Sequence, residues 1–210
     1  MSLKLFKKDS FSNDWSFYFD VILHLYIDQA NGAHRFMLMY TIGHSTRAIE
    51  EFLKILKEYD IKILADIRSW PSSRRNPPFN KDDLDKTLAG TGIKYVWLGK
   101  SLGGFRHVGL GADSPNTAWR NEGFRNYADH ALTEDFTSGL KELMELDHHG
   151  RTAVMCVEKH YWRCHRRILS DHLATQGVKV MHILDKSEAL EHKLTRFAAL
   201  KGGILFYPPH

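Results

Sequence analysis

Cysteine is nearly absent from this 210-residue sequence, which contains only Cys156 and Cys164. Two thiols are too few for a fold that is held together by a disulfide framework. Such scarcity is typical of proteins in a reducing compartment, where thiols serve chemistry, metal binding or packing. We therefore expect a cytoplasmic protein.

Long apolar runs and linker tracts are also lacking. The most apolar segment, residues 15–27, is interrupted by Asp20 and His24 and is shorter than the ~20 residues that a membrane span requires. No small-residue cleavage site follows it, so we expect neither a signal peptide nor membrane association. We interpret residues 1–36 as a lineage-specific or mis-started extension. No Pro-, Gly- or Ser-rich linker divides residues 37–210, which we expect to form a single α/β domain.

Charge of one sign is in only slight excess. The sequence has 29 Lys and Arg residues against 25 Asp and Glu residues, and this balance does not by itself indicate a polyanionic partner. The basic residues are concentrated in residues 68–81, which contain no acidic side chain, and in residues 159–167. With 43% hydrophobic and 26% charged residues, the chain has the composition of a protein that folds by itself.

Short apolar runs alternate with helix-length amphipathic segments from Met39 onward, which is the pattern of βαβ units on a parallel sheet. The expected fold is an open, mainly parallel five-stranded sheet with helices on both faces, a three-layer architecture of Rossmann-like or flavodoxin-like type. The expected strands cover residues 38–42, 61–67, 93–98, 152–157 and 178–184. Two helices are expected to follow capping residues, the first after Ser45 or Thr46 and the second after Asn80. Further helices are expected over residues 119–130, 133–146, 164–176 and 187–200.

Polar residues gather where the expected strands end, and ligands of open parallel α/β sheets bind at that edge. The sequence therefore predicts a functional site there. Its members are His44 and Ser45 after the first strand, Asp66 and Arg68 at the second, Gly103 and Gly104 after the third, Cys156 and Glu158 at the end of the fourth, followed by Cys164, His165 and Arg166, and His182 on the fifth.

Motifs that contain these residues resemble the recurring signatures of the domain of unknown function 488 family. They are TIGHST (residues 41–46), DIRSWPSSRRNPPF (66–79), GIKYVWLGKSLGG (92–104) and MCVEKHYWRCHR (155–166). The resemblance covers about residues 39–184. It implies an α/β fold and an active or binding site, but it names no reaction.

Arginines are the main reason to expect an anionic ligand. A guanidinium group offers a planar fork of donors that suits phosphate or carboxylate, and the start of the helix near Cys164 adds free backbone N–H groups. We expect a phosphorylated, nucleotide or nucleic-acid-derived substrate. The expected substrate-binding residues are Ser45, Arg68, Arg74, Gly103, Gly104 and Arg166.

Acid/base chemistry is the leading mechanism that the sequence supports. Asp66 and Glu158 follow neighbouring strands and are expected to act as a proton-transferring pair with His44. In the alternative interpretation, the two carboxylates only orient the arginines.

A thiol mechanism is a second hypothesis. Cys164 lies at a helix start beside basic residues, which lowers the pKa of a thiol, and His165 or His44 is its candidate base. Cys156, inside an apolar strand, is expected to be a core residue. The chain lacks the loop of rhodaneses and phosphatases, in which a cysteine precedes a glycine-rich anion cradle, and this absence counts against thiol chemistry.

Other classes of protein stay open. Cys156, Glu158, His160, Cys164 and His165 include donors for zinc or iron, but their spacing matches no common zinc module, so we assign no metal site. A metal or thiol-redox protein is therefore an alternative, as is a non-catalytic nucleotide or nucleic-acid binding module whose aromatic residues stack on bases. The sequence specifies neither a cofactor nor an oligomeric state. The aromatic candidates are Trp70, Phe79, Phe105 and Trp162, and the histidines expected at the surface are His148, His149 and His192.

Overall fold

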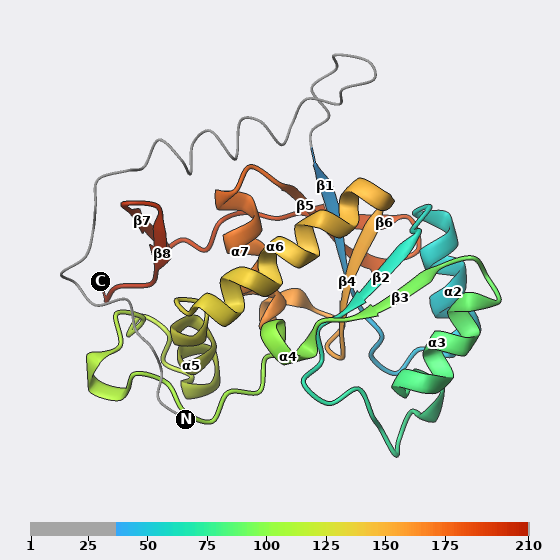
Figure 1. Ribbon diagram of the computed structural model, residues 1–210, viewed down its shortest axis with the longest axis horizontal. Coiled ribbons are helices and arrows are strands. Elements are labelled where there is room, and N and C mark those ends of the chain that lie inside the picture. The colour runs from blue at the N-terminus through green and yellow to red at the C-terminus, as the bar shows by residue number, and fades with distance from the viewer. Residues whose placement is uncertain (1–36, 210) are drawn as a thin grey trace, which may run out of the picture.

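A computed structural model describes residues 37–209, which form a six-stranded sheet with helices on both faces (Figure 1). The strand order is β3-β2-β4-β1-β5-β6. Strands β1 to β5 are parallel, and β6 is antiparallel to β5. The three-layer α/β class and its mainly parallel sheet are therefore confirmed. The proposed extension, residues 1–36, lies outside the described residues.

The helices and strands follow one another with short connections. Their bounds are β1 (Leu38–Gly43), α2 (Ile49–Glu58), β2 (Ile63–Asp66), α3 (Lys81–Ala89), β3 (Lys94–Trp97), α4 (Gly99–Leu102), α5 (Glu122–His130), α6 (Glu134–His149), β4 (Thr152–Cys156), α7 (Arg166–Thr175), β5 (Lys179–Asp185), β6 (Glu188–Glu191), β7 (Ala199–Lys201) and β8 (Ile204–Phe206), with short 3-10 turns η1 (Pro77–Phe79), η2 (Gly111–Asp113) and η3 (Tyr161–Arg163).

Two apolar cores lie on opposite faces of the sheet because successive strand residues point to opposite sides. On one face, Ile42 and Leu64 pack with Phe52 and Leu84 from α2 and α3. On the other face, strand residues such as Val154 pack with residues of α5, α6 and α7. Figure 1 shows α2 and α3 on one side of the sheet and α5, α6 and α7 on the other. Since β2 and β4 are buried on both faces, they read as short continuous apolar runs.

The expected helix over residues 187–200 is wrong. After a turn in which Ser187 has a φ of 57°, residues 188–191 form β6, and β7 and β8 then form a separate two-stranded hairpin. The side chain of His192 is drawn into a buried hydrogen-bond network with His182 and Asp171. These contacts override the helical spacing of the apolar residues, because helix propensity is a weak preference.

Both expected helix caps differ from the structure in their chemistry. The helix α2 begins after Ala48, and Ser45 instead has a φ of 51° and donates its N–H to the carbonyl of Val157 at 2.7 Å. Asn80 does occupy the position before α3, but its side chain accepts a hydrogen bond from the N–H of Ser73 at 2.6 Å. Asn80 therefore organises the basic loop rather than the helix start. In residues 37–209, no helix is long and apolar enough to cross a membrane.

Candidate functional site

The carboxyl ends of β2, β4 and β1 lie side by side, and the predicted polar residues follow all three. Asp66 is paired with Met155, and Gly43 is paired with Cys156, so the three strands end at nearly the same level. Beyond β1, the N–H of His44 donates to the carbonyl of Cys156 at 3.0 Å. The first strand and the fourth therefore stay together past the sheet, and their loops form a common edge.

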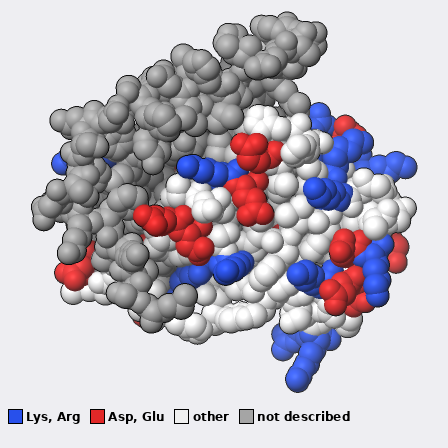
Figure 2. Space-filling model, in the orientation of Figure 1, with Lys and Arg blue, Asp and Glu red and all other residues white. Residues whose placement is uncertain are grey.

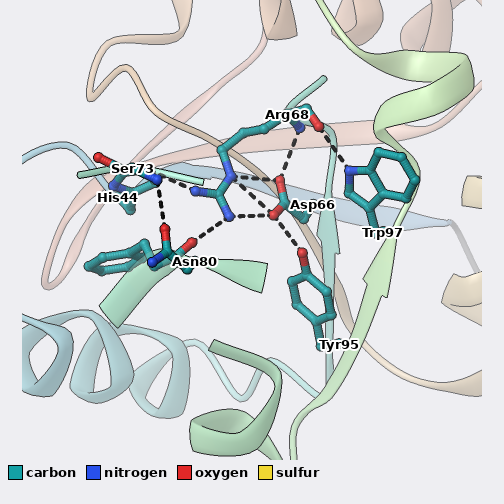
Figure 3. Close-up of polar contacts among 8 residues, drawn as sticks. His44, Asp66, Arg68, Ser73, Asn80, Tyr95 and Trp97 are labelled. Carbon is teal, nitrogen blue, oxygen red and sulfur yellow. Dashed lines mark hydrogen bonds and ion pairs between the residues drawn. The ribbon is translucent and has the colours of Figure 1, made fainter. Parts of the chain in front are cut away.

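An ion pair that is closed to solvent occupies the end of β2 (Figure 3). Asp66 Oδ1 lies 2.9 Å from Arg68 Nε, and Asp66 Oδ2 lies 2.5 Å from Arg68 Nη2. The Tyr95 hydroxyl donates to Asp66 Oδ2 at 2.7 Å, and burial together with the charge of Asp66 raises the pKa of Tyr95, so this phenol keeps its proton. Arg68 also donates to the carbonyl of Phe79 at 2.8 Å. The Asp66 carboxylate thus holds Arg68 in place.

His44 lies on the other side of Arg68 and is neutral near pH 7. Its ring is buried and stacks on Phe79 with centroids 4.4 Å apart. Burial and the charge of Arg68 lower the pKa of His44 to about 4. His44 Nδ1 lies 3.0 Å from the carbonyl oxygen of Ser45, which can only accept, so Nδ1 carries the proton. The Nε2 lone pair then faces Arg68 Nη1 at 3.4 Å, and the ring is a weak base.

Two cysteines and a histidine meet on the opposite face of the sheet. His165 Nδ1 lies 3.6 Å from the sulfur of Cys164 and 3.9 Å from the sulfur of Cys156, and the three atoms all lie within 4.8 Å of one another. Burial alone would raise the pKa of the Cys164 thiol, but the hydrogen bond from Cys156 and the charges of His165 and Arg166 bring this pKa well below its usual value. The same hydrogen bond and burial raise the pKa of Cys156. Of the two thiols, Cys164 therefore loses its proton more readily than Cys156.

Arg166 is buried and its donors are directed at the protein itself. Its Nη2 donates to the carbonyls of Glu158 and Lys159, its Nη1 lies 3.4 Å from the Thr41 hydroxyl, and its Nε lies 3.4 Å from the sulfur of Cys164. The side chain is 1% exposed. Arg166 thus fixes the loop between β4 and α7 and places a positive charge beside the sulfur of Cys164.

The glycines of the LGG motif are required by close packing. A Cβ on Gly104 would lie 2.2 Å from His165 Nδ1, and a Cβ on Gly103 would lie 2.4 Å from the Ser69 hydroxyl oxygen. Similarly, a Cβ on Gly43 would lie 1.8 Å from the carbonyl oxygen of Glu158. These glycines let loops from different strands approach one another at the site.

Glu158 and Arg74 do not join these buried groups. Both residues are exposed, and within residues 37–209 neither side chain forms a hydrogen bond or an ion pair with another. The Asp66 carboxylate is bonded to Arg68 and Tyr95, and no contact joins it to the Glu158 carboxylate in this part of the chain. The structure therefore brings His44, Asp66 and Arg68 together but leaves Glu158 apart.

Exposed aromatic side chains lie in the loops that follow β2 and α4. Trp70 and Phe105 are 63% and 56% exposed, and their ring centroids lie 4.8 Å apart. His107 packs on Phe105 at 4.4 Å, and the N–H of Phe105 donates to the Ser69 hydroxyl. We call Trp70, Phe105 and His107 the aromatic surface. In contrast, Phe79 is fully buried beneath His44.

His182, the expected site residue on the fifth strand, belongs to a buried chain of hydrogen bonds that the sequence did not indicate. His182 Nδ1 lies 2.7 Å from the Thr41 hydroxyl oxygen, and His182 Nε2 lies 2.9 Å from His192 Nδ1. His192 Nε2 lies 2.9 Å from Asp171 Oδ1, and the Tyr207 hydroxyl donates to Asp171 Oδ2 at 2.8 Å. The expectation that His192 is a surface residue is therefore wrong, because the turn into β6 brings it under α7. His148 and His149 are exposed as expected.

Comparison with known proteins identifies one family. The model of the family described as Domain of unknown function DUF488 matches residues 48–173, which is more than half of the chain and includes the sites at Asp66 and Cys164. No curated protein matches the chain, and no solved structure matches it.

Proposed function

We propose that this chain, which belongs to the family described as Domain of unknown function DUF488, binds a nucleotide or single-stranded nucleic acid at the carboxyl edge of its sheet. The observation that carries the proposal is the exposed aromatic surface beside the basic loop that follows β2. In this arrangement the bases stack on the aromatic rings and the phosphates contact the loop.

The aromatic surface has the properties of a stacking platform. Trp70 and Phe105 keep more than half of their area in contact with solvent even though they pack edge to face. Such exposure leaves apolar ring faces in water, which a stacked base would cover. Base stacking on aromatic side chains contributes about 1–3 kcal/mol per base and tolerates every sequence, because each base has a π-face.

Phosphate contacts in this proposal come from exposed cations. Arg68 and Arg166 already donate to protein groups and are 4% and 1% exposed. Arg74 and Arg75 lie in the same loop as Trp70, and both are exposed. The blue atoms at the lower edge of Figure 2 lie where the loop after β2 lies in Figure 1. An extended ligand could therefore contact the aromatic surface and the cationic loop together.

Acid/base turnover of the ligand is a weaker candidate. The oxygens of Asp66 are already hydrogen-bonded by Arg68 and Tyr95. The pKa of His44, lowered to about 4, makes its ring a weak base near neutral pH. Asp66 and His44 are therefore better suited to holding the loop after β2 in place than to transferring a proton.

Fluorescence anisotropy with a labelled oligothymidylate tests the proposal. Trp70→Ala should weaken binding by about 1–3 kcal/mol and leave the salt dependence unchanged. Replacing Arg74 and Arg75 with alanine should instead lower the slope of log K against log salt, by about 0.7 for each lost phosphate contact. Lys57→Ala, at the far end of α2, and Leu200→Ala, on the separate hairpin, are the matched controls. A flat salt response, or equal losses in the controls, would contradict the proposal.

A further inference from the structure

We propose that Cys156, Cys164 and His165 form a binding site for a thiophilic divalent cation such as zinc, with three protein ligands and an open fourth position. The proposal goes beyond nucleic-acid binding and does not depend on it, because it rests on the side chains of Cys156, Cys164 and His165, none of which belongs to the aromatic surface or to the basic loop.

The distances from His165 Nδ1 to the two sulfurs are close to those of a tetrahedral centre, and the two sulfurs lie within 4.8 Å of each other. With metal–sulfur bonds of about 2.3 Å and metal–nitrogen bonds of about 2.1 Å, two ligand atoms of such a centre lie about 3.6–3.8 Å apart. His165 Nδ1 lies 3.6 Å from the Cys164 sulfur and 3.9 Å from the Cys156 sulfur. One ring nitrogen thus faces two sulfurs at once, although a single proton on it could serve only one of them.

The three ligands are held in place before any ion arrives. Cys156 is the last residue of β4, and His165 directly precedes α7. The rings of Tyr127 and His165 pack edge to face with centroids 4.9 Å apart, and the backbone of Gly104 also packs against the His165 ring. Arg166 fixes the connecting loop through the carbonyl of Glu158. A prepared site loses little conformational entropy on binding.

The donor set selects the class of ion. Two thiolates and an imidazole are soft to borderline ligands that suit zinc, whereas magnesium and calcium prefer oxygen. In residues 37–209 no further His, Cys, Asp or Glu joins the group. Structural zinc sites are closed by four protein ligands, and sites with three keep a position for water or substrate.

Charge at the site favours an anion in the open position. Binding of the ion would release the thiol proton of Cys156 to solvent, because the thiolate is the metal ligand. The two thiolates then neutralise a divalent ion, and Arg166, whose Nε lies 3.4 Å from the Cys164 sulfur, leaves one net positive charge. Hydroxide or an anionic group of a ligand would balance it. The backbone of Gly104 packs against the His165 ring, and Gly104 is followed directly by Phe105 of the aromatic surface.

Cobalt titration of the reduced, metal-free, full-length chain tests the site. Co²⁺ should bind stoichiometrically and produce visible d–d bands of tetrahedral intensity together with a thiolate-to-cobalt charge-transfer band, and zinc should displace it. Cys156→Ser and Cys164→Ser should each remove part of the charge-transfer band. His165→Ala should weaken binding more than the 10–100-fold that changes to outer-shell groups cause.

His160→Ala is the matched control, since His160 lies in the same loop but outside the cluster, and it should bind cobalt like the wild type. Circular dichroism of each metal-free variant separates loss of ligand from loss of fold. The absence of a charge-transfer band in the reduced wild type would overturn the proposal, as would a band that survives in Cys164→Ser unchanged. Oligothymidylate binding by the same samples shows separately whether the proposed function stands.

Discussion

The Asp66 carboxylate and the Arg68 guanidinium form an ion pair, 2.5 Å between Oδ2 and Nη2, with side chains that are 0% and 4% exposed. The pair organises the loops around it. Arg68 donates to the carbonyl of Phe79, and the carbonyl of Arg68 accepts from the Trp97 indole at 2.9 Å. This buried ion pair therefore connects strand β2 to strand β3 and to the loop before α3.

Asp66→Asn should destabilise the fold by about 3–5 kcal/mol, because it leaves the Arg68 charge buried without a counter-ion. Urea denaturation followed by circular dichroism measures this loss. The control is Asp60→Asn, which breaks the exposed pairs of Asp60 with Lys62 and Arg151 and should leave the denaturation midpoint nearly unchanged. Equal midpoints for Asp66→Asn and wild type would show that the pair does not stabilise the fold.

Acidification should destabilise the protein through His44. Its folded-state pKa of about 4 lies below the ordinary value of 6.5, so the unfolded chain binds the proton more tightly. The contribution of neutral His44 is fully present above pH 6.5, decreases as the pH falls, and is lost below about pH 4. From the shift, the loss by pH 5 is on the order of 2 kcal/mol.

Comparison of His44→Gln with wild type at pH 7 and pH 5 isolates this contribution, since other buried histidines titrate in both proteins. The glutamine variant should lose less stability between the two pH values. His149→Gln, at an exposed position, should retain the wild-type dependence. If the glutamine variant and the wild type show the same pH dependence, His44 is not held neutral by its surroundings.

Gly104→Ala should destabilise the protein by about 1–3 kcal/mol, the usual cost of overpacking, because the added Cβ would lie 2.2 Å from His165 Nδ1. The His165 ring must move, and cobalt binding at the cluster should weaken with it. Gly90→Ala is the matched control. Gly90 has a φ of −65°, and an added Cβ would make only ordinary contacts, the shortest 3.5 Å from the carbonyl oxygen of Thr87, so this change should be neutral or stabilise by about 0.4–1 kcal/mol. Thermal unfolding of both variants decides between these outcomes.

The alternation of strands and helices could be predicted because it follows from the local spacing of apolar residues along the chain. Each of the five parallel strands carries a short apolar run, and residues such as His44 and Asp66 follow the strand ends directly. Once a parallel sheet is expected, its carboxyl edge follows. The prediction of a helix over residues 187–200 was wrong. Leu190 and Leu194 have helical spacing, but residues 188–191 pair with β5 as strand β6, and His192 is buried.

The state of each site residue could not be predicted, because it depends on contacts across the fold. A sequence does not distinguish an arginine that faces solvent, such as Arg74, from one that is buried like Arg166, whose partner Thr41 lies 125 residues away. Cys156 was expected to be a core residue, and it is buried. Its proximity to Cys164 arises only because η3 turns the chain back between them.

Tyr207→Phe should test the buried chain of hydrogen bonds under α7. The Tyr207 hydroxyl donates to Asp171 Oδ2 at 2.8 Å, while His192 and the N–H of Thr195 contact Oδ1. Removing the hydroxyl leaves a buried carboxylate oxygen without that donor, which costs about 1–3 kcal/mol. Tyr40→Phe is the control, because the half-buried Tyr40 hydroxyl has no hydrogen-bond partner among the described residues. Urea denaturation should show a lower midpoint for Tyr207→Phe alone, because the C-terminal segment is anchored to α7 through Asp171. Unchanged midpoints in both variants would mean that apolar packing of Tyr207, rather than this hydrogen bond, holds that segment in place.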